Sequence, residues 1–190
     1  MRIRASRLAA AALIIASTGC SGGAEPETVE TLDGGISSEV TPPVAPRSLD
    51  EIAPGDTLGI LALMRATMSE GERLAGTLER RDTTMPPDGY REPRVLSLWK
   101  RGDLPVKLLA TEPNEDGLMR LETITWFVAG DIAVVQEPFA VMLFDADRLV
   151  MWTDEAMEPV DAPEMDRMSK EKSVVDSVRT RLEVFGITYP

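Results

Sequence analysis

The stretch Phe127-Val-Ala-Gly-Asp-Ile132 has a spacing that also occurs in Trp99-Lys-Arg-Gly-Asp-Leu104 and in Phe144-Asp-Ala-Asp-Arg-Leu149. In each stretch, two residues separate an aromatic residue from a Gly or Asp, and a polar residue and an aliphatic residue follow. This spacing is typical of a β-hairpin with a two-residue loop, because Gly, and less comfortably Asp, tolerates the positive φ of such loops. We therefore expect antiparallel strands from about residue 95 to residue 153.

The register of these hairpins assigns the side chains to two faces of a sheet. With loops at 101–102, 129–130 and 146–147, each aromatic residue lies opposite its aliphatic residue, and alternate residues point to opposite faces. The first face is expected to be core and receives Val95, Trp99, Leu104, Val106, Leu108, Leu121, Phe127, Ile132, Val134, Met142, Phe144, Leu149 and Met151. The second face mixes apolar and charged residues, namely Leu96, Leu98, Leu109, Ile124, Trp126, Val135, Val141, Leu143, Val150 and Trp152 with Lys107, Arg120, Glu122, Asp131, Asp145 and Arg148.

A helical segment is predicted before the strands. Asp56 is a good N-cap residue, and apolar residues recur at helical spacing after it, from Ile60 to Leu78. Gly71 lies inside this pattern and lowers helix propensity, so the segment is either one helix or two. The stretch 83–93 is expected to be a loop, because it contains several Pro residues and a Gly.

A long helix is predicted near the C-terminus. Asp161 and Glu164 are spaced as in a capping box, and Gly186 is typical of a helix end. The stripe expected to cover the first face consists of Met165, Met168, Val175, Val178, Leu182 and Phe185.

Residues 48–190 are therefore predicted to form a single α+β domain. Its expected fold is an antiparallel β-meander of about six strands packed against the long C-terminal helix. The N-terminal helical segment packs either beside that helix or on the second face.

The composition excludes several classes of function. The formal net charge of −12 repels nucleic-acid phosphates. The absence of His excludes a His-based triad, and the single Cys cannot form a disulfide within the chain. The acidic residues show neither the spacing of a calcium loop nor a distinct pair for glycoside chemistry. We expect no nucleic-acid partner, cofactor, metal site or catalytic residues; an acid-pair hydrolase is the one enzymatic alternative.

Residues 1–20 have the features of an export signal. Three Arg residues precede the apolar run Leu8–Ala16, and small residues follow it up to Cys20. This order is typical of a secretory signal peptide, and the apolar run is too short to span a bilayer as a helix. The last four residues, Ser17-Thr-Gly-Cys20, resemble the lipobox of bacterial lipoproteins.

The resemblance implies that Cys20 is acylated, as with palmitate, and becomes the first residue of the mature protein. Several acyl chains anchor a protein stably, since each buried methylene contributes about 0.8 kcal/mol. Ser21 differs from the Asp that commonly retains such proteins in the inner membrane. The resemblance therefore implies the outer membrane, facing the periplasm, if the host has two membranes. Residues 21–47, rich in Gly, Ser, Pro, Glu and Thr, are expected to be a disordered linker.

The second face offers the candidate binding surface. An apolar patch with a basic rim is expected from Trp126, Trp152, Ile124, Leu143 and Val150 with Arg120, Arg148 and Lys107. Aromatic and Arg residues are enriched where proteins bind one another. We therefore expect a non-catalytic, membrane-anchored envelope lipoprotein that is a binding or accessory module for another envelope protein. Two alternatives stay open: the N-terminal helix covers these residues as core, or the domain carries a small apolar or lipid ligand between sheet and helix.

Overall fold

The computed structural model describes residues 47–86, 92–114, 117 and 119–189. The predicted signal peptide, Cys20 and the predicted linker up to residue 46 lie outside the described residues. The elements are η1 (Leu49–Glu51), α1 (Thr57–Ala75), β1 (Arg80–Met85), β2 (Arg94–Arg101), β3 (Leu104–Pro113), β4 (Arg120–Val128), β5 (Asp131–Glu137), β6 (Ala140–Asp145), β7 (Arg148–Asp154) and α2 (Glu164–Glu183).

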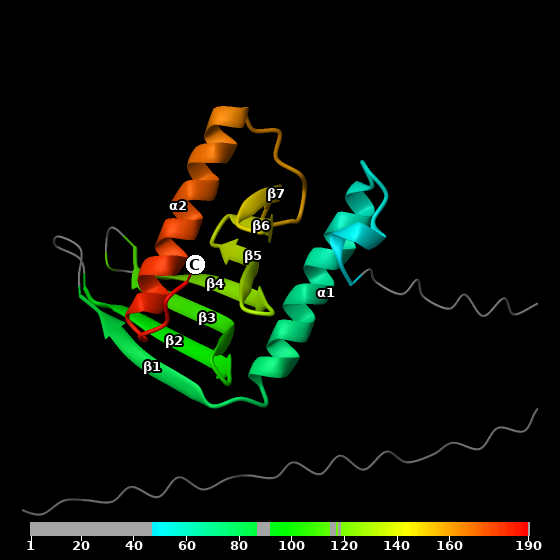
Figure 1. Cartoon of the computed structure of the whole chain (residues 1–190). Helices are drawn as coiled ribbons and strands as arrows, with labels where there is room; N and C mark the ends of the chain where they lie inside the picture. The colour runs from blue at the N-terminus through cyan, green and yellow to red at the C-terminus, as the bar shows by residue number, and fades with distance from the viewer. Residues whose placement is uncertain (1–46, 87–91, 115–116, 118, 190) are drawn as a thin grey trace, which may run out of the picture. The chain divides into compact units, whose positions relative to one another are not determined.

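The seven strands form one antiparallel sheet in sequential order, with β1 and β7 at its two edges. α1 packs on one side of the sheet and α2 on the other (Figure 1). This arrangement confirms the predicted α+β meander with a C-terminal helix, and it places the N-terminal helix on the second face. We call the two sides of the sheet the α1 face and the α2 face.

α1 is a single helix that begins at the predicted N-cap. The Asp56 carboxylate accepts a hydrogen bond from the main-chain N–H of Gly59 at 2.9 Å. The helix continues through Gly71 to Ala75. The alternative of two shorter helices is therefore not observed.

β1 occupies residues that were predicted in part to be a loop. Thr83, Thr84 and Met85 pair with β2, so the prediction of a loop from residue 83 is wrong. Most side chains of β1 are polar and exposed, and the strand lacks the apolar alternation by which strands are recognised. Its pairing with β2 makes it a strand of the sheet, which therefore has seven strands where about six were predicted.

Two of the three predicted hairpins have the expected register. The loops 129–130 and 146–147 have positive φ at both positions, as a type I′ turn requires. Phe127 and Phe144 each pair with the aliphatic residue predicted for them. The spacing of the sequence therefore predicts these two turns correctly.

The first hairpin differs from the prediction by one residue. Its loop is 102–103 instead of 101–102, and Trp99 pairs with Lys107 instead of Leu104. Gly102 has a φ of 61° at the first loop position, and Gly at that position favours a type II′ turn. The predicted Trp99–Leu104 pair is wrong because Gly102 begins its loop, whereas Gly130 ends its loop.

A β-bulge follows each of the three loops. Val106, Ala133 and Val150 each lack a partner in the opposite strand, since the register shifts by one residue there. A shift of one residue turns the following side chains to the other face. Together with the displaced first loop, the bulges reverse the predicted face of Leu98, Val134, Val135, Met151 and Trp152.

Each face of the sheet carries its own apolar core. The α2-face core joins the strand residues Leu98, Leu108, Phe127, Ile132, Val135, Met142, Phe144 and Leu149 to Val174, Val175, Val178 and Leu182 of α2. The α1-face core joins Trp126, Val134, Val141 and Leu143 to Leu61, Leu63 and Met64 of α1. Burying a large apolar side chain stabilises a fold by about 1.5–3 kcal/mol, so both helices contribute to holding the sheet.

The first turns of α2 depart from the prediction. The N-cap is Pro163, without a side-chain hydrogen bond, so the predicted cap at Asp161 is wrong. Met165 and Met168 were expected in the buried stripe, but both are exposed. Only the later part of the stripe lies on the sheet.

The first half of α2 covers the edge strand β7 instead. The Arg167 guanidinium donates hydrogen bonds to the carbonyl oxygens of Leu149 and Val150 at 3.1 and 3.2 Å. The Glu171 carboxylate accepts a hydrogen bond from the main-chain N–H of Leu149 at 2.7 Å. Backbone groups that an edge strand leaves open thereby gain partners.

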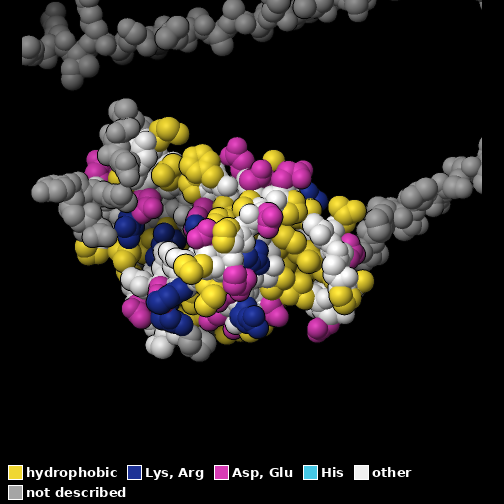
Figure 2. All heavy atoms as spheres, turned by 90° about the horizontal axis from the view of Figure 1, so that it is seen from above, with side chains coloured by type: hydrophobic (Ala, Val, Ile, Leu, Met, Phe, Trp, Pro, Cys, Tyr) yellow, Lys and Arg dark blue, Asp and Glu magenta, His cyan; other side chains and the backbone are white. Residues whose placement is uncertain are grey.

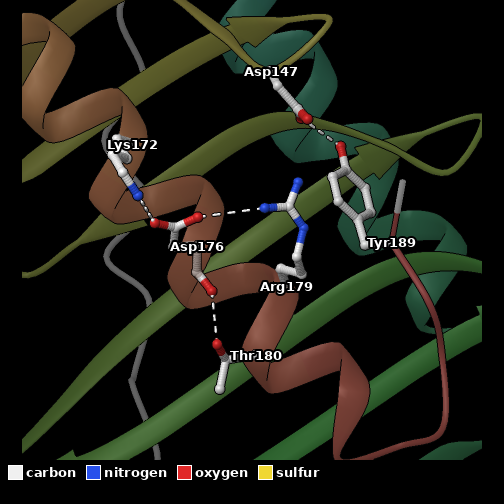
Figure 3. A network of polar contacts seen from close by, with 6 residues as sticks. All are labelled: Asp147, Lys172, Asp176, Arg179, Thr180 and Tyr189. Atoms are coloured by element: carbon white, nitrogen blue, oxygen red, sulfur yellow. Dashed lines mark hydrogen bonds and ion pairs between the residues drawn. The ribbon is translucent and has the colours of Figure 1, made fainter.

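Tyr189 fixes the C-terminal segment to two of the tight turns. Figure 3 shows its contact with one of them, at Asp147. Its hydroxyl donates to Asp147 Oδ1 at 2.6 Å and accepts from the main-chain N–H of Ile132 at 3.0 Å. Burial and the hydrogen bond to Asp147 raise the pKa of Tyr189 to about 12. One side chain thus links the β4–β5 turn with the β6–β7 turn.

This contact predicts a loss of stability in alkali. In an unfolded chain a tyrosine ionises near pH 10, whereas folded Tyr189 keeps its proton up to about pH 12. The stabilisation is therefore complete below about pH 10 and is lost as the pH rises through about 12. Urea unfolding in this range should show the free energy of unfolding falling more steeply for the wild type than for Tyr189→Phe. Equal slopes for the two proteins would argue against the contact.

Candidate functional site

α1 covers half of the surface predicted from the sequence. Trp126 and Leu143 are only 2% and 3% exposed, and Ile124 and Val150 are half-buried in the same core. The structure therefore brings these four residues together as core beneath α1, and not as a surface. Of the alternatives left open by the sequence, the covering helix is the one observed.

The other four predicted residues are not brought together. Trp152 packs on the α2 face, whereas Lys107 is held on the α1 face by an ion pair. Arg120 and Arg148 are exposed at opposite ends of the sheet, at the starts of β4 and β7. The predicted aromatic surface with its basic rim is therefore wrong, because the bulge at Val150 turns Trp152 to the other face.

A row of side chains across the α1 face holds the second half of α1. The Glu72 carboxylate accepts a hydrogen bond from Trp126 Nε1 at 3.0 Å and lies 2.6 Å from Lys107 Nζ. Lys107 Nζ and the Arg80 guanidinium lie 5.1 and 5.5 Å from the centre of the Trp99 ring, which are cation–π distances. The row gives the buried indole N–H and the largely buried ammonium their partners.

Gly71 allows α1 to approach the sheet closely. A Cβ at this position would lie 2.2 Å from Trp126 Cδ1, a distance at which one of the two groups must move. The absence of a side chain therefore lets the indole ring fill the space beneath the helix. This contact explains why a residue with low helix propensity lies inside α1.

A groove of about 620 Å³ lies beside this contact, between the second half of α1 and the tips of two hairpins. Its apolar lining includes Leu63, Leu74, Leu104, Val106, Phe127 and Val128. Its charged residues are Arg47, Glu70 and Arg101. The volume is in the range of pockets that hold one small ligand.

The two hairpin tips form one wall of the groove. A Cβ on Gly130 would lie 3.0 Å from the Leu104 side chain, so the β2–β3 and β4–β5 tips touch. Leu104 and Val128 are 53% and 56% exposed although they are aliphatic. The predicted core position of Leu104 is therefore wrong, and Val128 had no predicted role. A signal was present, because both residues flank two-residue loops, where a side chain extends past the body of the sheet.

Exposed apolar side chains also occur elsewhere on the domain. Figure 2 shows hydrophobic side chains in separate patches among acidic and basic ones. Exposure alone therefore does not distinguish a site. The groove differs because its apolar side chains line a concave space.

No family model matches the chain, and neither a curated protein nor a solved structure matches it. Among the described residues, no group of three or more His, Cys, Asp or Glu side chains is placed to hold a metal ion. In the same part of the chain, no helix is long and apolar enough to cross a membrane.

The close approach at Gly71 predicts an unusual effect of alanine. Ala is the better helix former by about 1 kcal/mol, but a Cβ here collides with the Trp126 ring, and such overpacking costs about 1–3 kcal/mol. Urea unfolding should therefore give a lower free energy of unfolding for Gly71→Ala.

Gly76→Ala is the matched control at the end of the same helix, because a Cβ there would make contacts at 3.5 Å. Its free energy of unfolding should stay close to that of the wild type. A Gly71→Ala protein as stable as this control would contradict the packing of α1 on Trp126.

Proposed function

We propose that the protein is a non-catalytic lipoprotein of the cell envelope whose groove holds a small apolar or lipid ligand. The proposal includes the anchor at acylated Cys20 and, in a host with two membranes, a position on the outer membrane facing the periplasm. The observation that carries the ligand part is the groove beside α1, where Leu104 and Val128 stay exposed on a concave, mostly apolar wall.

An apolar ligand would cover side chains that the domain itself leaves in water. Covering half of a Leu or Val side chain contributes on the order of 1 kcal/mol. The hydrophobic effect has no preferred direction, and most of the groove lining offers no fixed hydrogen-bonding pattern. Such a lining suits an acyl chain better than a polar metabolite.

The described part of the chain begins at the groove. Arg47 is the last residue of the predicted linker, and it lines the groove. A flexible coil of the length of residues 21–47 has a reach of roughly 25–30 Å. In this proposal the groove works close to the membrane that supplies the ligand.

Another envelope protein is the second candidate partner. Phe139 is 76% exposed, and Met165 and Met168 are exposed as well. Aromatic and Met side chains are enriched where proteins bind one another. These three residues replace the predicted surface as contacts for a protein partner, and pull-down from membranes with wild type and with Phe139→Ala tests them. Equal recovery of a stoichiometric partner by both proteins would exclude Phe139.

The anchor predicts incorporation of a fatty acid at one residue. Cells given a labelled fatty acid should label the wild-type protein, and Cys20→Ser should stay unlabelled, because Cys20 is the only thiol in the chain. Membrane fractionation should recover the wild type with the membrane-anchored lipoproteins. The Cys20→Ser variant should be absent from that fraction. An unlabelled wild-type protein in a host with working lipoprotein enzymes would contradict the anchor.

The groove predicts where a lipid probe reacts. A photoreactive fatty acid added to membranes that hold the full-length protein should crosslink to peptides that include α1 and the two hairpin tips. Val128→Glu should abolish these crosslinks, because it places a charge on the apolar wall. Phe139→Glu is the control outside the groove and should leave them unchanged. Crosslinks that persist in Val128→Glu, or that are lost equally in Phe139→Glu, would exclude the groove as the site.

A further inference from the structure

We propose, resting on the function above, that the groove selects amphiphiles with an anionic head group, a carboxylate or a phosphate, which Arg47 and Arg101 bind while the acyl chain lies along the apolar wall. The ligand class then becomes a single-chain anionic lipid rather than apolar molecules in general.

The one acidic residue of the groove is already neutralised. Both carboxylate oxygens of Glu70 lie within hydrogen-bonding distance of the Arg73 guanidinium, at 2.6 and 2.7 Å. The hydrogen bond with Arg73 lowers the pKa of Glu70, so the carboxylate is ionised and paired. Arg73 does not line the groove. The Glu70–Arg73 pair therefore presents no net charge to a ligand.

Neither arginine of the groove is held in an ion pair, although the charge of Arg101 acts on Glu70 from a distance and helps to lower its pKa. Among the residues that the structure describes, no carboxylate lies within ion-pair distance of the Arg47 or Arg101 guanidinium. The Glu51 carboxylate accepts a hydrogen bond from the main-chain N–H of Arg47 at 2.9 Å, so this contact does not involve the Arg47 guanidinium. In a chain with 32 acidic and 20 basic residues, two guanidinium groups on one apolar groove thus keep their hydrogen-bond donors open to an external anion.

The chemistry of guanidinium favours this head group. Its planar fork donates two parallel hydrogen bonds to a carboxylate or a phosphate, and its methylene stem packs against apolar surface. An uncharged amphiphile would cover the two charges without pairing them, which is unfavourable. The negative charge of the whole chain opposes a bound anion only weakly, because physiological salt screens charges that lie farther away than about 8 Å.

The test compares two probes of equal chain length. Full-length lipidated protein is placed in phosphatidylcholine vesicles and titrated with a photoreactive palmitic acid or with the corresponding photoreactive alcohol. The concentration for half-maximal crosslinking to the groove should be about tenfold lower for the acid. Arg101→Gln and Arg47→Gln should each remove most of this preference and leave the alcohol titration unchanged. Arg148→Gln, an exposed arginine at the tip of another hairpin, is the matched control and should behave as the wild type.

Unlabelled competitors identify the source of the anion. Lysophosphatidic acid and palmitic acid should both displace the acid probe, whereas inorganic phosphate should not. Displacement by inorganic phosphate at a similar concentration would overturn the amphiphile and indicate a site for the free anion.

The remaining outcomes separate this proposal from the function on which it rests. The acid and the alcohol could crosslink to the groove equally well, in the wild type and in both Arg variants. This result would overturn the proposed selection of an anionic head group and would leave the groove as a site for apolar ligands. The absence of groove crosslinks with either probe would overturn both.

Discussion

The packing of the Trp126 indole beneath Gly71 determines how close α1 lies to the sheet. A sheet with apolar side chains on both faces needs a cover on each side, and α2 covers only one. A buried indole N–H also needs an acceptor, and Glu72, the next residue of the helix, supplies it while it pairs with Lys107. Gly71, which has no side chain, and Glu72, the charged residue after it, together position α1 on the sheet.

The groove is a consequence of that position. α1 contacts β3, β4 and β5, and the β2–β3 and β4–β5 tips line a space beside it, where Leu104 and Val128 stay exposed. The open backbone edge of β7, by contrast, is covered by side chains of α2. Side chains of α2 thus give partners to backbone groups on one edge of the sheet, whereas the hairpin tips keep apolar side chains exposed beside a concave space.

Local patterns in the sequence predict much of this fold. The turns at 129–130 and 146–147, the N-cap at Asp56 and the α+β meander all follow from residue types at short spacing. The displaced first loop and the bulges do not, because the same spacing fits a loop shifted by one residue and does not determine the register beyond the turn. One bulge after each loop reverses the faces of residues such as Val134 and Trp152. The predicted surface fails because α1 covers half of it and the bulge at Val150 turns Trp152 to the other face.

The candidate site was harder to predict than the fold, since it depends on contacts between distant segments. The two-residue loops beside Leu104 and Val128 indicate side chains that extend past the sheet, but the groove that they line depends on where α1 crosses the sheet. Gly71 is an exception, because the sequence already marks it as unusual: it has low helix propensity and lies inside a predicted helix. The Trp126 ring, 55 residues later in the chain, explains its position. An unfavourable residue inside an element can therefore mark a close contact.

An NMR measurement of that contact tests the position of α1 most directly. The packing described here predicts a strong nuclear Overhauser effect between the α protons of Gly71 and the Hδ1 proton of the Trp126 indole. A Trp126 ring that shows no contact with Gly71, and whose protons instead lie near α2 or in water, would contradict it.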